Sequence, residues 1–138
     1  MKTPNIYLRK GTFIMGKFVV KETKTGYTLS LKATNGQVIG IGGEVFSTEA
    51  SCLNSIESIK KNAPIAEVEN QTVEGYEAVK HPKFEIYKDN AGEFRFRLKA
   101  RNGEPILASE GYTTLANCKN GVESVKKNAP EAPVEKAE

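Results

Sequence analysis

The stretch Phe94–Pro130, FRFRLKARNGEPILASEGYTTLANCKNGVESVKKNAP, has a second, weaker copy in Tyr27–Pro64 of the same chain. The match is closest where TEASCLNSIESIKKNAP (Thr48–Pro64) aligns with TLANCKNGVESVKKNAP (Thr114–Pro130). It continues for a few residues past the shared proline. An internal repeat of this kind decides the architecture of a chain. We therefore expect two similar folding units.

Length and composition favour two units that share one core. The chain has 138 residues, so each half is near the size at which a separate hydrophobic core barely stabilises itself. Apolar residues at 38% and charged residues at 27% are typical of soluble globular proteins, and a net charge of +3 points to no particular partner. No segment has the apolar length of a signal peptide or a membrane span, so we expect a cytoplasmic protein.

The repeat boundaries predict the domain organisation. We expect a disordered N-terminal extension over residues 1–15, a first repeat over 16–71, a linker over 72–81, a second repeat over 82–136 and a short end over 137–138. Because the repeat match begins at Met15-Gly16-Lys17, Met15 is also a candidate for the true start of the protein.

Hydrophobic periodicity predicts three strands in the first repeat, over residues 17–23, 27–33 and 37–41. Asn35-Gly36 joins the last two strands, and we expect a type I′ turn there because that turn needs positive φ at both central residues. Ser47 or Thr48 then caps an amphipathic helix that ends before Pro64.

The second repeat shows the same pattern more clearly. A strand over 83–88 leads through a glycine turn to a strand that places Phe94, Phe96, Leu98 and Ala100 on one face. The alternation aligns Ile86 with Phe96 and places Glu85 beside Arg97. Asn102-Gly103 repeats the predicted turn, and an apolar helical stripe follows.

A short segment with one valine follows each predicted helix, AEVEN over residues 66–70 and APVEK over 132–136. A three-stranded sheet with one helix would leave exposed strand edges. We therefore predict that each short segment forms a strand that covers the edge of the other repeat.

The run GEFRFRLKARNGEPILASEGY (Gly92–Tyr112), followed by a capped helix and SVKKNAP, resembles the YegP-like family of small proteins with one or two repeats. The resemblance implies an α+β fold in which two tandem β3-α-β repeats form one pseudo-twofold domain. It implies a joint antiparallel sheet, helices packed on it and exchanged last strands. The family has no established activity. The first copy departs from the pattern at Thr28 and Ser30, where the second copy has arginines, and at Gly42-Gly43.

Few residues of the types that catalyse reactions or bind metals stand at useful spacings. His81 is the only histidine and precedes Pro82 in the predicted linker. Cys52 and Cys118 stand singly on the two helices, so we expect buried thiols, with a disulfide across the pseudo-twofold as the alternative. The chain has no phosphate-cradling glycine loop and no nucleophile elbow. We therefore expect no metal, no cofactor and no enzyme, although a site built from Tyr, Lys and Glu between the repeats is a third possibility.

Four cations alternate along one predicted strand and so share one face: Arg95, Arg97, Lys99 and Arg101. Such a row could bind anions or a nucleic-acid backbone. Glu85 and Glu104 are expected opposite two of these cations, and the first repeat has only Lys32 in the equivalent row. An ordinary solvated sheet face is the simpler interpretation.

Isoleucines form the second candidate surface. If the Asn-Gly turns set the strand register, Ile39 and Ile41 share the outer face with Lys32, and Ile106 lies on the same face as the cationic row. Apolar residues there indicate a face covered by the other repeat, another chain or a ligand. A β-bulge that reverses the alternation is the alternative explanation.

The sequence thus predicts a small α+β interaction module that is monomeric, internally pseudo-dimeric and not membrane-bound. A protein partner at Ile39, Ile41 and Ile106 is the first hypothesis, and nucleic-acid binding at the cationic row is the alternative.

The face assignment can be tested through Phe96. If this ring lies in a shared core, Phe96→Ala should lower the free energy of unfolding by about 3–5 kcal/mol. Urea denaturation measures the change, and a variant with full wild-type stability would show that the face was assigned wrongly.

Overall fold

The computed structural model describes residues 16–137, which form an α+β fold of two β3-α-β repeats. The first repeat contains β1 (Gly16–Thr23), β2 (Gly26–Ala33), β3 (Val38–Gly42), α1 (Glu49–Asn62) and β4 (Glu67–Asn70). The second contains β5 (Lys83–Lys88), β6 (Phe94–Lys99), β7 (Pro105–Ala108), α2 (Leu115–Asn128) and β8 (Val134–Lys136). No helix within residues 16–137 is long and apolar enough to cross a membrane. The predicted extension over 1–15 lies outside the described residues.

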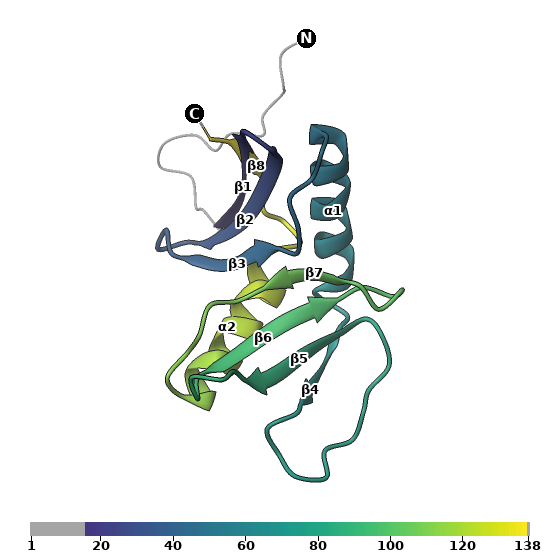
Figure 1. The fold of residues 1–138 in the computed structure, drawn as a ribbon, viewed down its shortest axis with the longest axis vertical. Helices are drawn as coiled ribbons and strands as arrows, with labels where there is room; N and C mark the ends of the chain where they lie inside the picture. The colour runs from purple at the N-terminus through teal and green to yellow at the C-terminus, as the bar shows by residue number, and fades with distance from the viewer. Residues whose placement is uncertain (1–15, 138) are drawn as a thin grey trace.

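One continuous sheet joins the two repeats in the order β4-β5-β6-β7-β3-β2-β1-β8 (Figure 1). The two halves meet where β3 pairs with β7, with Ile41 opposite Ala108. At the sheet ends, β4 of the first repeat pairs with β5 of the second, and β8 of the second pairs with β1 of the first. The predicted exchange of the last strands is confirmed.

The exchanged strands run parallel to their new neighbours, so the sheet is mixed and the expected antiparallel arrangement is wrong at both ends. A parallel neighbour requires the chain to travel back along the whole strand before it pairs, which takes a dozen or more residues. Residues 71–82 between β4 and β5 make this return. The length of the linker follows from the parallel pairing.

Both helices pack on the same side of the sheet (Figure 1). Each helix contacts strands of both repeats, α1 through β2 and β7, and α2 through β6, β2 and β3. The side chains of Thr48 and Thr114 accept hydrogen bonds from the first turn of each helix, which satisfies a backbone donor that the helix leaves free. One set of fully buried side chains joins the halves: Phe18, Leu29, Leu31, Phe84, Ile86, Phe96, Leu98 and Leu107.

The Asn-Gly turns differ from the predicted type I′ geometry. The amide of Gly36 donates to the carbonyl of Ala33, so Gly36 is the last residue of its turn, with φ of 85°. Asn35 Oδ1 accepts a hydrogen bond from the amide of Gln37 at 2.9 Å, which fixes the asparagine before the glycine. This is a three-residue hairpin loop with glycine in the left-handed region. Asn102-Gly103 forms the same loop.

The longer loop moves the strand register by one residue, and a β-bulge then restores it. Lys32 pairs with Val38, while Leu31 pairs with Gly40, so Ile39 is the extra residue. Ile106 is the equivalent extra residue, between the pairs Lys99–Pro105 and Leu98–Leu107. The prediction that Ile39 and Ile106 face outward is therefore wrong: Ile39 is only 9% exposed, and Ile106 packs against the core.

The two repeats fill one equivalent core position differently. Tyr112 pairs with Phe94 through the backbone and stacks on Phe96, with ring centroids 6.3 Å apart. A Cβ atom at Gly121 would lie 2.9 Å from both Tyr112 Cζ and Phe96 Cε2, which is too close. In the first repeat the ring is Phe46, without a hydroxyl, and the helix position equivalent to Gly121 is Ser55. The second repeat thus has two larger side chains at this place, Tyr112 and Phe96 against Phe46 and Leu29, and the smaller helix residue.

Exchanging this pair tests the packing. Gly121→Ser should destabilise the protein by about 1–3 kcal/mol because it overfills the space beneath Tyr112. Tyr112→Phe removes the hydroxyl, so the double variant should be more stable than the sum of the single effects by about 1 kcal/mol. Urea denaturation of all four proteins completes the cycle, and strictly additive effects would contradict this account.

Candidate binding face

The face of the sheet turned away from α1 and α2, here called the open face, carries every second residue of each strand. The strand registers place one cross-strand row along the whole sheet: Glu69, Glu85, Arg97, Ala108, Ile41, Ser30, Val19 and Glu135. The row changes from charged residues in the second repeat to small and apolar residues at the centre and in the first repeat. The two halves of the open face therefore have different chemistry.

In the second repeat, the open face carries a buried network of ion pairs. Lys83 Nζ lies 2.8 Å from a carboxylate oxygen of Glu69 and 3.1 Å from one of Glu85. Arg97 and Lys99 contact the same Glu85 carboxylate at 2.6 and 3.3 Å. The side chains of Glu69, Glu85 and Lys83 are 2%, 4% and 9% exposed. Each cation of this network therefore already contacts a carboxylate, although three cations share two carboxylates.

The network holds both carboxylates in the charged form. Burial opposes ionisation of Glu69, but hydrogen bonds from Lys83, Gln71 and the Val79 amide outweigh it and lower the pKa to about 2. Burial likewise opposes ionisation of Glu85, and Arg97 and Lys83 lower its pKa. The hydrogen bond to Glu69 raises the pKa of Lys83. Because the unfolded carboxyl groups titrate near pH 4.3, this stabilisation is present above about pH 5 and is lost as the pH falls toward 2.

Three of the four cations predicted to form a binding row already have partners. Arg95 Nε contacts Asp89 at 2.6 Å, and Arg97 and Lys99 share Glu85, as expected for Arg97. The guanidinium of Arg97 also lies 4.3 Å above the ring of Tyr87. Arg101 lies beyond the end of β6, in an exposed turn, so it does not extend the row along the strand. That these four residues bind anions stays a prediction.

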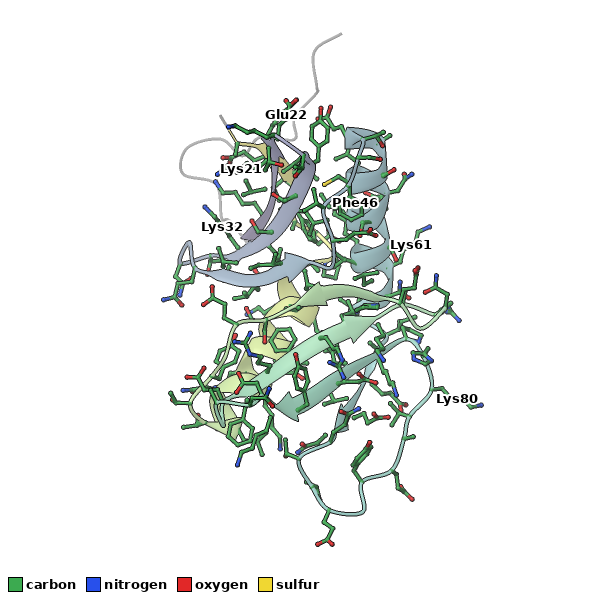
Figure 2. All side chains as sticks on the ribbon, viewed as in Figure 1. Lys21, Glu22, Lys32, Phe46, Lys61 and Lys80 are labelled. Atoms are coloured by element: carbon green, nitrogen blue, oxygen red, sulfur yellow. The ribbon has the colours of Figure 1, made fainter. Side chains whose placement is uncertain are left out.

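In the first repeat, the open face lacks this network. Val19 and Ser30 occupy the positions of Glu85 and Arg97, and only the pair Lys17–Glu135 remains, at 2.7 Å and 38% and 43% exposed. Lys21 and Lys32 form no ion pair with any carboxylate of residues 16–137. Figure 2 shows both lysines pointing away from α1. This half of the open face thus presents unneutralised positive charge.

The centre of the open face is apolar and exposed. Ile41 is 45% exposed and faces Ala108 across the junction of the repeats, and Val38 is 39% exposed beside Lys32. Of the predicted interaction residues, Ile41 therefore lies on the open face, whereas Ile39 and Ile106 do not. Sequence reasoning missed Val38 because it assigned the turns to the wrong type.

The remaining candidate residues from the sequence are two cysteines and one histidine. Cys52 and Cys118 are free and buried, and burial raises the pKa of Cys118 to about 11, which disfavours the nucleophilic thiolate. Within residues 16–137, no three His, Cys, Asp or Glu side chains gather as metal ligands would. His81 is exposed and lies near Gly103.

Comparison with known proteins places both repeats in one family of unknown function. Residues 24–70 and 89–135 each match DUF1508, a domain of unknown function. The UPF0339 protein PA0329 of Pseudomonas aeruginosa is 35% identical over 117 residues, which cover 84% of this chain and 92% of that protein. A UPF0339 protein of Stutzerimonas stutzeri is 75% identical over 48 residues, but these cover only 35% of this chain and 43% of that relative.

The solution structure of yegP from Escherichia coli, described as a protein of unknown function, has the same fold. Its TM-score to this chain is 0.73 at 26% identity, and the alignment covers 91% of this chain and 96% of that one. None of these relatives bears the name of an enzyme.

The buried network can be tested against its own counterpart in the first repeat. Lys83→Met leaves Glu69 without its main cation and should cost about 3–5 kcal/mol at pH 7. Lys17→Met removes the equivalent exposed pair and should cost less than about 1 kcal/mol. The cost of Lys83→Met should shrink at pH 3, where the freed carboxylates take up protons. Urea denaturation at both pH values measures this, and equal costs for the two variants would contradict the structure.

Proposed function

The chain belongs to the DUF1508 family, and from its open face we propose that the protein is a non-catalytic binding module that docks an acidic segment of a partner protein. The docking surface comprises the apolar centre and the lysines of the first repeat: Val19, Val38, Ile41, Lys21 and Lys32. It retains one of the isoleucines predicted from the sequence and replaces the other two.

One observation carries the proposal: the cations of the buried network in the second repeat contact carboxylates, whereas Lys32 on the open face of the first repeat contacts none within residues 16–137. In the second repeat Arg97 and Lys99 both contact Glu85, whereas the first repeat has Val19 at the position of that carboxylate and still has Lys32. Exposed Val38 pairs with Lys32, and exposed Ile41 lies on the same face, so apolar side chains and a cation without an ion pair to residues 16–137 share this surface.

The chemistry of this surface selects the kind of partner. Lysines with long apolar stems beside a small apolar patch complement a segment that alternates carboxylates with apolar side chains. Steering by the lysines would raise the rate of association and make binding sensitive to salt.

Nucleic-acid binding through Arg95, Arg97, Lys99 and Arg101 is the alternative. It has less support, because Arg95, Arg97 and Lys99 already contact carboxylates and binding would have to break those ion pairs. No base-stacking aromatic residue accompanies Arg101 in its turn.

Fluorescence anisotropy with defined probes tests both functions. A labelled peptide that carries glutamates on both sides of a Leu-Phe pair should bind at low salt and weaken as salt is added. Lys21→Glu/Lys32→Glu should reduce its affinity about tenfold, because two attractive contacts become repulsive. Lys80→Glu/Lys119→Glu makes the same charge change at exposed sites off the open face and should leave the affinity within about twofold.

Three results would contradict the docking proposal: no binding of the glutamate peptide, equal loss in both double variants, or equal binding of a peptide with lysines in place of glutamates. Labelled single- and double-stranded oligonucleotides test the alternative in the same assay. Salt-sensitive oligonucleotide binding that Arg95→Glu/Arg97→Glu abolishes would favour it.

A further inference from the structure

Two shallow hollows lie at equivalent places in the two repeats. The first has a volume of about 610 Å³ and lies between the C-terminal half of α1 and the turn at Arg101-Asn102. The second, of about 520 Å³, lies between α2 and the turn at Thr34-Asn35. Each hollow combines the helix of one repeat with the hairpin turn of the other. The pseudo-twofold therefore builds the same site twice.

Four helix residues that line the first hollow have identical equivalents in the second, and Asn54 lines the first hollow alone. Glu57, Ser58, Lys61 and Asn62 line the first, and their equivalents line the second: Glu123, Ser124, Lys127 and Asn128. Some exposed helix positions elsewhere differ between the repeats, as Leu53 and Lys119 do, whereas others such as Ala50 and Ala116 are the same.

Packing explains only part of this identity. The side-chain amide of Asn62 donates to the carbonyl and the hydroxyl of Ser58 at 2.8 and 3.1 Å, and Asn128 makes the same two bonds to Ser124. The side chains of Asn35 and Asn102 accept hydrogen bonds from backbone amides within their own turns.

The glutamates and lysines that line the hollows make no hydrogen bonds of this kind within the described part of the chain. They are exposed and form no ion pair with another group of residues 16–137. Figure 2 shows Lys61 at the C-terminal half of α1. Each hollow thus offers one free carboxylate and one free ammonium group.

We propose that the two hollows bind the head group of an α-amino acid, whose ammonium contacts the glutamate and whose carboxylate contacts the lysine. Helix positions four residues apart place their Cβ atoms about 5–6 Å from each other, so opposite charges at these positions can receive the two ends of a small zwitterion. A ligand of one charge would be attracted by one side chain and repelled by the other. The pairing of a free carboxylate with a free ammonium selects a ligand that carries both charges.

The turn that closes each hollow distinguishes the two sites. The first hollow contains Arg101, whereas the second has Thr34 in the same place. Arg101 adds a cation that the second hollow lacks, so the first hollow should prefer an amino acid with an acidic side chain. This assigns a role to the one predicted cation that lies outside the ion-paired row.

Amide NMR titration of the full chain tests the proposal with three ligands. Glycine should shift resonances at both hollows, whereas trimethylglycine, which keeps both charges but has no N–H donor and a bulkier cation, should shift neither. Glutamate should bind the first hollow about two- to fivefold more tightly than glycine, because an exposed cation adds that much attraction. At the second hollow the two ligands should bind equally.

Matched variants separate the proposal from a general effect of charge. Lys61→Gln should abolish shifts at the first hollow only, Lys127→Gln at the second only, and Lys119→Gln at neither. Exchanging the turn residues through Arg101→Thr and Thr34→Arg should move the preference for glutamate from the first hollow to the second. If glycine and trimethylglycine shift the same resonances equally, or if no ligand shifts the hollows, the proposal is wrong, and the glutamates and lysines serve only as helix-stabilising pairs.

Discussion

A half-sheet of three strands has edges that its own repeat cannot cover, and the exchanged strands β4 and β8 resolve this for both repeats at once. The remaining features of the fold follow from the exchange. The linker 71–82 is long because it must bring the chain back to start a parallel strand. Glu69 reaches Lys83 only because β4 lies beside β5. Neither repeat has a complete sheet without the other.

Much of this fold could be predicted from the sequence, because the repeat and the alternation of side chains are local signals. The pairing of Ile86 with Phe96 and of Glu85 with Arg97 followed from the alternation together with a loop at Asn90–Gly92. Ile39 and Ile106 were misplaced because the dipeptide Asn-Gly occurs in two kinds of hairpin loop. In the loop that forms here, the amide of the residue after the glycine donates to the asparagine side chain, as Gln37 does to Asn35.

The candidate site was harder to predict than the fold, because the ion pairs that distinguish the two halves of the open face depend on strands that meet only through the exchange. The parallel register that places Glu69 next to Glu85 and Lys83 has no local signature in the sequence. Once that register is known, the cationic row no longer indicates a free binding surface, because Arg97 and Lys99 contact the buried carboxylate of Glu85. The surface that remains open belongs to the first repeat, whose departures at Thr28 and Ser30 had counted only as weakness of the match.

The continuity of the chain through the linker has a consequence for how such a surface can evolve. When two separate identical subunits assemble with twofold symmetry, every substitution appears twice, so a residue that suits one half is imposed on the other. Here the halves are encoded separately, so position 19 carries valine while the equivalent position 85 carries the glutamate of the buried network. Tandem duplication thus frees one half to preserve the stability of the fold while the other half explores new contacts.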